Sequence, residues 1–148
     1  MQSIQRYFPA LLALLLLHGC AVYMAYGLYR TIQDINQTLT LVDGSIGRIQ
    51  MIVNEGKDLK RAAADGKLIS TLAEKIPTLI QKEVELATKE KIETLSLALK
   101  LSSLAFTKNA TEENLSGATK SYNEMAATYN KFTGLMDELS DSVGPLPR

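Results

Sequence analysis

The chain lacks the residues from which most active sites and covalent frameworks are built. Its 148 residues include one cysteine, one histidine and no tryptophan. A single cysteine excludes an intrachain disulfide. A Cys/His metal site is excluded as well, because His18 is the only histidine beside that cysteine. Carboxylates remain, but their positions are typical of solvent-facing helix surfaces. We therefore expect no enzyme, no metal, no cofactor and no small-molecule substrate.

An excess of one charge sign is also missing, and aromatic residues are few. The 16 basic and 16 acidic residues cancel, so the chain has no basic surface of the kind that binds nucleic acid. Aromatic residues make up 6% of the chain, which argues against sandwiches and barrels built from aromatic and β-branched strands. We expect no nucleic-acid partner and predict an all-α fold.

What the chain does have is one long uncharged stretch, residues 7–29. A helix of that length is about 35 Å long, and the hydrocarbon core of a bilayer is about 30 Å thick. We predict a membrane anchor in residues 1–30, an extracytoplasmic helical domain in residues 31–141 and a flexible tail in residues 142–148. The short N-terminal end is easier to leave in the cytoplasm, which favours the bacterial inner membrane with the rest in the periplasm.

A second interpretation of the anchor depends on Cys20. The segment Leu17-His18-Gly19-Cys20 resembles a bacterial lipobox, in which Cys20 would become the lipidated first residue. The histidine inside the motif and the apolar residues after Cys20 favour an uncleaved transmembrane helix instead. An outer-membrane lipoprotein and an ordinary cleaved signal peptide stay open as alternatives, and all three export the remaining chain.

The clearest periodic signal follows the anchor, where apolar residues recur in alternating steps of three and four. This spacing predicts one amphipathic helix leaving the membrane. Gly44 and Gly47 weaken it, so an interruption near residue 44 is an open alternative. Residues 54–67 lose the stripe, and we expect a hairpin or a frayed polar helix there. The stripe consists of Ile32, Ile35, Leu39, Val42, Ile46, Ile49 and Val53.

The middle of the chain carries a second apolar stripe that meets a proline. Leu68 to Ile76 have helical spacing, and at Pro77 the helix must kink or a new one begin. Beyond it the apolar face continues to Phe106. Alternating leucines in residues 95–101 leave a strand possible, but β-branched residues and a hairpin signal are missing, so we predict a helix. We expect the broad apolar surface of residues 95–104 to occupy the middle of the bundle.

The last helix is predicted to begin near Thr111, after a turn at residues 108–110. Its apolar stripe again has heptad spacing. The stripes can bury one another as an up-down bundle, or they can seal against other copies as a coiled coil, so both sets form a possible helix-packing seam. This second stripe consists of Leu115, Ala118, Tyr122, Met125, Tyr129, Phe132, Met136 and Leu139.

Two short segments resemble the LemA family of membrane-anchored bacterial helical proteins. Ile76-Pro77-Thr78-Leu79-Ile80 looks like the Ile-Pro-Asn-Leu segment of that family, and Tyr122-Asn123 followed by Tyr129-Asn130 looks like its paired Tyr-Asn motif. The Trp-containing segment expected soon after the anchor is missing. The resemblance implies an N-terminal membrane helix, an extracytoplasmic antiparallel helical bundle and a poorly defined cellular role.

Together these features predict a non-enzymatic, membrane-anchored interaction or scaffold protein of the bacterial cell envelope. Its helical stripes would bind a protein partner or other copies of the chain. One alternative is a phage-type lysis protein that bridges the envelope, like an inner-membrane spanin. Another is a sensory helical bundle working with a separate signalling partner.

Overall fold

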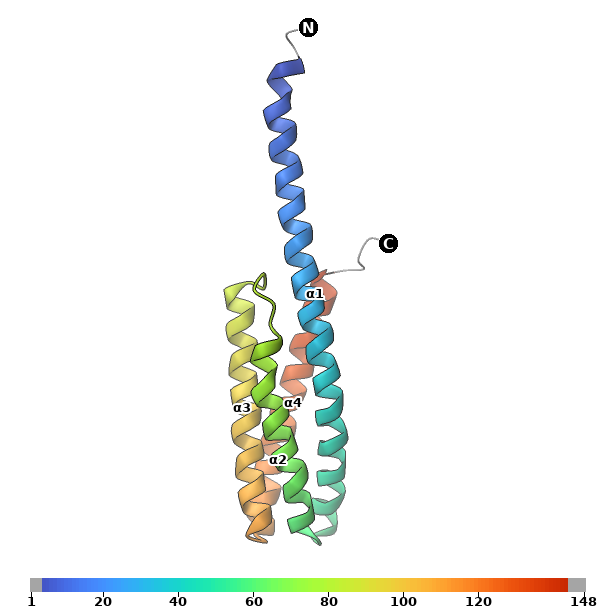
Figure 1. Ribbon diagram of the computed structural model, residues 1–148. Helices are drawn as coiled ribbons and strands as arrows, with labels where there is room; N and C mark the ends of the chain where they lie inside the picture. Colours follow the sequence, from blue (N-terminus) through green and yellow to red (C-terminus); the bar gives the residue numbers. More distant parts are fainter. Residues whose placement is uncertain (1–3, 144–148) are drawn as a thin grey trace.

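The computed structural model describes the backbone of residues 4–143 and the side chains of residues 23–143. The chain forms α1 (Ile4–Glu55), α2 (Leu59–Lys75), the short 3₁₀ helix η1 (Ile76–Leu79), α3 (Leu86–Thr111) and α4 (Leu115–Val143). The four long helices make an up-down bundle, in which α1 and α3 each pack against α2 and α4 (Figure 1). The predicted all-α bundle is confirmed.

The core of the bundle is built on the first apolar stripe. All seven of its residues, from Ile32 to Val53, are buried in α1. The predicted single amphipathic helix is confirmed, and the alternative of an interruption near residue 44 is wrong, because α1 continues to Glu55. Gly44 and Gly47 lie on the exposed face. The buried stripe on the opposite face therefore holds the helix together where glycine alone would weaken it.

The first turn is much shorter than residues 54–67, where a hairpin or a frayed polar helix was predicted, and most of that stretch is helical. The turn occupies only residues 56–58, with Gly56 and Asp58 in the left-handed region at φ of 64° and 55°. Helix α2 begins directly after it, because Leu59 and Ala62 are buried against the core. The burial of these two residues, one turn apart, stabilises a helix in the polar stretch that begins at Leu59.

Small side chains set the contact between α2 and α3. Gly66 is buried on α2, in line with Ala62, Ser70 and Ala73. A Cβ atom placed on Gly66 would lie 2.8 Å from Phe106 Cδ1. The two helix backbones approach closely at this point because no side chain stands between them.

The apolar face continues beyond Pro77 as predicted, with Ile92, Leu99 and Phe106 buried, but on a separate helix. Pro77 lies in the first turn of η1, and residues 80–85 then reverse the chain direction. The stretch is therefore divided into two antiparallel helices, which makes four helices from three stripes. The placement of residues 95–104 was partly wrong, because Leu97, Leu101 and Leu104 lie on the outside of α3.

The turn between α3 and α4 lies later than predicted. Helix α3 continues through residues 108–110 and ends at Thr111, so the helix start predicted there is wrong. Asn114 is the cap of α4, and its Oδ1 accepts a hydrogen bond of 3.0 Å from the Gly117 backbone N–H. Glu113 adopts a positive φ of 56° in the turn. The backbone N–H of Asn114 donates a 2.9 Å hydrogen bond to the backbone carbonyl of Asn109 at the end of α3. This backbone hydrogen bond closes the turn.

The N-terminal part of α1 projects beyond the end of the bundle (Figure 1). Of the predicted membrane anchor, residues 1–30, only residues 23–30 have described side chains, and Cys20 lies outside that part. Within the described part of the chain, no helix is long and apolar enough to cross a membrane. At the other end, α4 reaches Val143, and residues 144–148 of the predicted tail lie outside the described residues.

Candidate functional site

The interior of the bundle is polar at only a few positions, and most of its serines form hydrogen bonds within their own helix. Ser96 and Ser102 donate to backbone carbonyls of their own helix at 2.8 Å and 3.0 Å. Ser121 does the same in α4 at 2.7 Å. Among the described residues, every buried side-chain nitrogen and oxygen atom has a hydrogen-bond partner. These serines therefore contribute to packing, and their hydroxyls are not directed at a common point.

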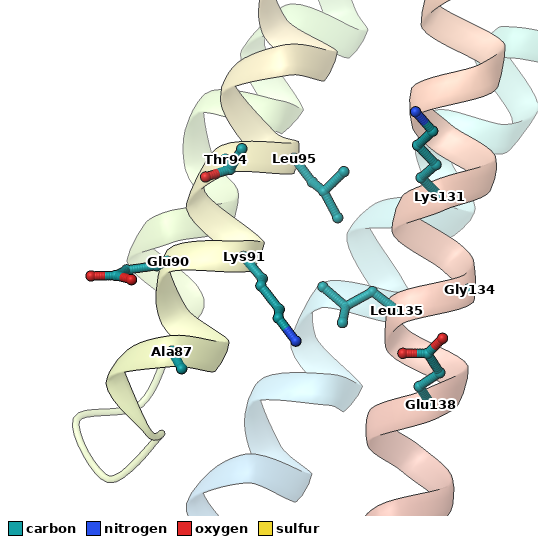
Figure 2. Close-up of a pocket in the computed structure, with 9 residues that line it drawn as sticks. All are labelled: Ala87, Glu90, Lys91, Thr94, Leu95, Lys131, Gly134, Leu135 and Glu138. Atoms are coloured by element: carbon teal, nitrogen blue, oxygen red, sulfur yellow. The ribbon is translucent and has the colours of Figure 1, made fainter.

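One concave surface lies between α3 and α4. It has a cavity volume of about 760 Å³ and follows the N-terminal half of α3 and the C-terminal half of α4 (Figure 2). We call it the α3–α4 groove. It is lined by Ala87, Glu90, Lys91, Thr94, Leu95, Lys131, Gly134, Leu135 and Glu138.

Local sequence explains why the two helices leave a groove here. Gly134 has no side chain, and a Cβ atom placed on it would meet nothing within 4 Å. Ala87 on the facing helix is also small. These two small residues leave open space between the longer side chains that line the groove.

The groove combines an apolar floor with charged side chains. Leu95 and Leu135 extend toward each other from the two helices (Figure 2). The Lys91 ammonium group and the Glu138 carboxylate point toward one another across the gap, and they are not within ion-pair distance. Lys131 adds a second cation on α4. This pattern suits an apolar segment that carries charges of both signs along its edges.

A second region of contact lies where α1 leaves the bundle. The backbone N–H of Gln81 donates a 2.9 Å hydrogen bond to Oγ1 of Thr31, which is fully buried. Glu83 lies against Gly27, where a Cβ atom would be 2.9 Å from Glu83 Cβ. A hydrogen bond with Tyr23 lowers the pKa of the Glu83 carboxyl group. The loop of residues 80–85 is thus fastened to α1, and the predicted span overlaps this contact in residues 23–29.

Two further polar contacts join α1 to its neighbours. Asp43 of α1 lies near Tyr129 of α4, and burial together with this carboxylate raises the pKa of Tyr129 to about 12. Arg48 donates from Nε and Nη2 to Asp65 Oδ1 of α2, at 3.0 Å and 2.5 Å. This hydrogen bond raises the pKa of Arg48. Both contacts lie at the edge of the bundle, where they orient α1 against α2 and α4.

The residues of the predicted packing seam lie mostly inside one chain. Those of α1 are buried, and in α4 Met125, Phe132 and Met136 are buried as well. Tyr122 and Tyr129 are half-buried at the rim, and burial raises the pKa of Tyr122. Leu115 differs, because it is 42% exposed in the first turn of α4. The stripes are thus occupied by intrachain packing.

Sequence reasoning missed the α3–α4 groove. Its residues come from helices that the sequence does not pair, and Lys91 and Lys131 follow no recognisable motif. One available signal was Gly134, an isolated glycine within a strong helical pattern. Such a glycine often marks a packing or binding requirement.

In residues 23–143, no group of three or more His, Cys, Asp or Glu side chains is placed to hold a metal ion. Neither a family model, nor a curated protein, nor a solved structure matches the chain.

Proposed function

We propose that this chain is a non-enzymatic, membrane-anchored interaction protein of the bacterial cell envelope. In this proposal the N-terminal segment holds the protein at the inner membrane, with the bundle in the periplasm. The bundle presents the α3–α4 groove to a protein partner. The proposal shifts the partner-binding role from the apolar stripes to the groove, because the stripes are buried within one chain.

The α3–α4 groove is the observation that carries this proposal. Only two helices line it, so it has two walls and a floor, with a volume of about 760 Å³. An enclosed small-molecule pocket would surround most of its ligand. A groove between two antiparallel helices instead suits a helix or an extended segment that lies along the groove. Leu95 and Leu135 form the apolar floor of the groove. The lysines and glutamates on both edges would fix the direction of that segment.

The anchor part of the proposal rests on the uncharged N-terminal stretch and on the continuity of α1. Residues 7–22 precede the contact between Tyr23 and Glu83, and they form a helix of about 24 Å. That length lies near the lower limit for a membrane-spanning segment. The tyrosines at positions 23, 26 and 29 would then lie at the membrane surface, where aromatic residues are common. Lipidation at Cys20, giving an outer-membrane lipoprotein, is the alternative form of the same anchor.

Intact mass of the mature protein, isolated from bacterial membranes, tests the anchor. The mass of the full chain supports the transmembrane helix. Loss of the first 19 residues with acyl mass on Cys20 supports the lipoprotein. Recovery of the chain in the soluble fraction, cleaved and without acyl mass, would contradict both forms.

Site-specific photo-cross-linking tests the groove. A photoreactive amino acid replaces Thr94 or Lys131, which face the groove from α3 and α4, and the control replaces exposed Gln50 on α1. We expect the same defined protein adduct from both groove positions and none from Gln50. Identical adducts from all three positions, or adducts from none, would refute the groove as a partner site.

A further inference from the structure

Helix α3 is apolar on two opposite faces, although only one of them meets the core. Ile92, Leu99 and Phe106 are fully buried. On the other side, Leu97, Leu101 and Leu104 are 57%, 57% and 44% exposed. We call these three residues the leucine ridge. Their spacing of four and three residues places them on one face of α3, as in a helix that packs against another helix.

The leucine ridge is flanked by charges of opposite sign at its two ends. Glu90 and Glu93 continue the same helix face toward the N-terminus of α3. Glu93 also lies 3.9 Å from Lys89 Nζ one turn back on α3, and because both side chains are exposed this pair is weak and leaves the Glu93 carboxylate open to a second cation. Lys108 continues it toward the C-terminus and is exposed. The face therefore has an acidic end, an apolar middle and a basic end.

We infer that the leucine ridge is a self-association surface that pairs α3 of two copies in antiparallel orientation. In this pairing Leu97 of one copy lies opposite Leu104 of the other, and Leu101 lies near the two-fold axis. The acidic end of each ridge then faces Lys108 of the other copy. A parallel pairing would set Glu90 and Glu93 against themselves and Lys108 against itself, which is repulsive. The charge order thus selects the antiparallel arrangement.

The residues near the two-fold axis are compatible with this pairing. Lys100 lies beside the leucine ridge, next to Leu101, so the two copies bring their lysines toward each other. Each Lys100 already forms an ion pair of 2.9 Å with Glu74 of α2. This exposed ion pair reduces the repulsion between the two Lys100 side chains near the axis, without removing it.

The expected affinity follows from the size of the surface. One helix face with three leucines is smaller than a standard protein interface, which buries about 1,200–2,000 Å² in total. We therefore expect a weak dimer, with a dissociation constant in roughly the micromolar range. Two symmetric charge contacts then make an appreciable part of the affinity, and this makes charge reversal a sensitive test.

Antiparallel pairing also places the projecting ends of the two α1 helices at opposite ends of the dimer. The pairing itself does not depend on the membrane anchor, but its consequence for membranes rests on the proposed anchor. Two copies anchored in the same bilayer stand side by side in parallel and do not present complementary ridges. Copies anchored in two facing bilayers do, so the leucine ridge would join vesicles that carry the chain on their outer surfaces.

Sedimentation of the full-length chain in detergent tests the pairing independently of the anchor orientation, because each copy can then turn freely. We expect a monomer–dimer equilibrium that Lys108→Glu weakens by about tenfold or more, since it makes two attractive contacts repulsive. The double variant Glu93→Lys with Lys108→Glu should restore most of the affinity. The matched control is Lys120→Glu, an exposed lysine of α4 with the same charge change and no expected effect.

The contribution of the leucine side chains to the dimer can also be tested with a matched control. Leu101→Gln should abolish the dimer, whereas Leu41→Gln should leave it intact, because Leu41 is 59% exposed on α1, away from the ridge. A chain that stays monomeric at all concentrations overturns the proposal. So does a dimer that is insensitive to both Lys108→Glu and Leu101→Gln.

Cysteine cross-linking determines the orientation. In a Cys20→Ala background, chains with Leu97→Cys are mixed with chains carrying Leu104→Cys and treated with a short bis-maleimide. Antiparallel pairing predicts cross-links between the two variants and few within either. Cross-links mainly between identical variants would establish parallel pairing and refute the antiparallel inference.

Discussion

The closest helix contact in the bundle gives the sharpest prediction for stability. Gly66 of α2 faces α3, and an added Cβ atom would lie 2.6 Å from Thr107 Oγ1 and 2.8 Å from Phe106 Cδ1. Phe106 is fully buried and cannot move aside without disturbing the core. Thr107 is held by a 2.8 Å hydrogen bond to the Ser103 carbonyl. Gly66→Ala should therefore force the two helices apart.

The change in the free energy of unfolding caused by Gly66→Ala follows from two opposing effects. Replacing glycine by alanine in a helix interior is favourable by about 1 kcal/mol. Overpacking a close contact costs about 1–3 kcal/mol. For Gly66→Ala we expect a net loss of about 1 kcal/mol in the free energy of unfolding. In a domain of this size that corresponds to a melting temperature lower by about 4 °C.

Gly47 and Gly134 provide the matched controls. Both lie inside helices, on α1 and α4, and a Cβ atom at either position meets nothing within 4 Å. The same substitution should therefore raise the melting temperature by about 4 °C at each site. Thermal unfolding of the full-length variants in detergent, followed by far-UV circular dichroism, measures all three. A Gly66→Ala variant as stable as Gly47→Ala would refute the reasoning.

Three other changes test the turns and the helix contacts. Thr31→Val removes the acceptor for the Gln81 N–H and should cost about 1–3 kcal/mol, with faster hydrogen exchange at Gln81; Thr31→Ser keeps the bond and should cost little. Glu113→Gly should stabilise the chain by about 1 kcal/mol in urea unfolding, because glycine accepts the positive φ of 56° without strain; an unchanged midpoint would contradict this. The raised pKa of Tyr129 means that the folded chain keeps the phenol proton at a pH where the unfolded chain loses it. Stability should then fall as pH rises from about 10 to about 12, and Tyr129→Phe should remove that part of the loss. Asp43→Asn should lower the pKa of Tyr129 in an ultraviolet titration, and no change would exclude Asp43 as a cause.

The sequence predicts the helices best where one apolar stripe faces one core. The residues from Ile32 to Val53 have a single buried face, and all of them were assigned to a packing seam. The boundaries were harder to predict, because they depend on contacts far away in the chain. Thr111 looks like a helix start on the basis of its hydroxyl group and the acids after it. Asn114 is the actual cap because Ala110 remains buried and keeps α3 helical to that point.

The surfaces could not be predicted because periodicity does not distinguish two apolar faces of one helix. Leu97 and Leu99 are neighbours in the same alternating run, yet Leu99 is fully buried and Leu97 is 57% exposed. Which face meets the core depends on where α2 and α4 lie. The α3–α4 groove depends on helix pairing in the same way, since Gly134 and Ala87 make a groove only when their helices are adjacent.

The uninterrupted α1 has a mechanical consequence. Its 52 residues make a rod of about 80 Å that has no joint between its projecting part and the part inside the bundle. Tilting or twisting the N-terminal end would therefore turn the whole bundle as a lever, and the α3–α4 groove would swing around the α1 axis. The orientation of the N-terminal segment thus sets the direction in which the groove faces.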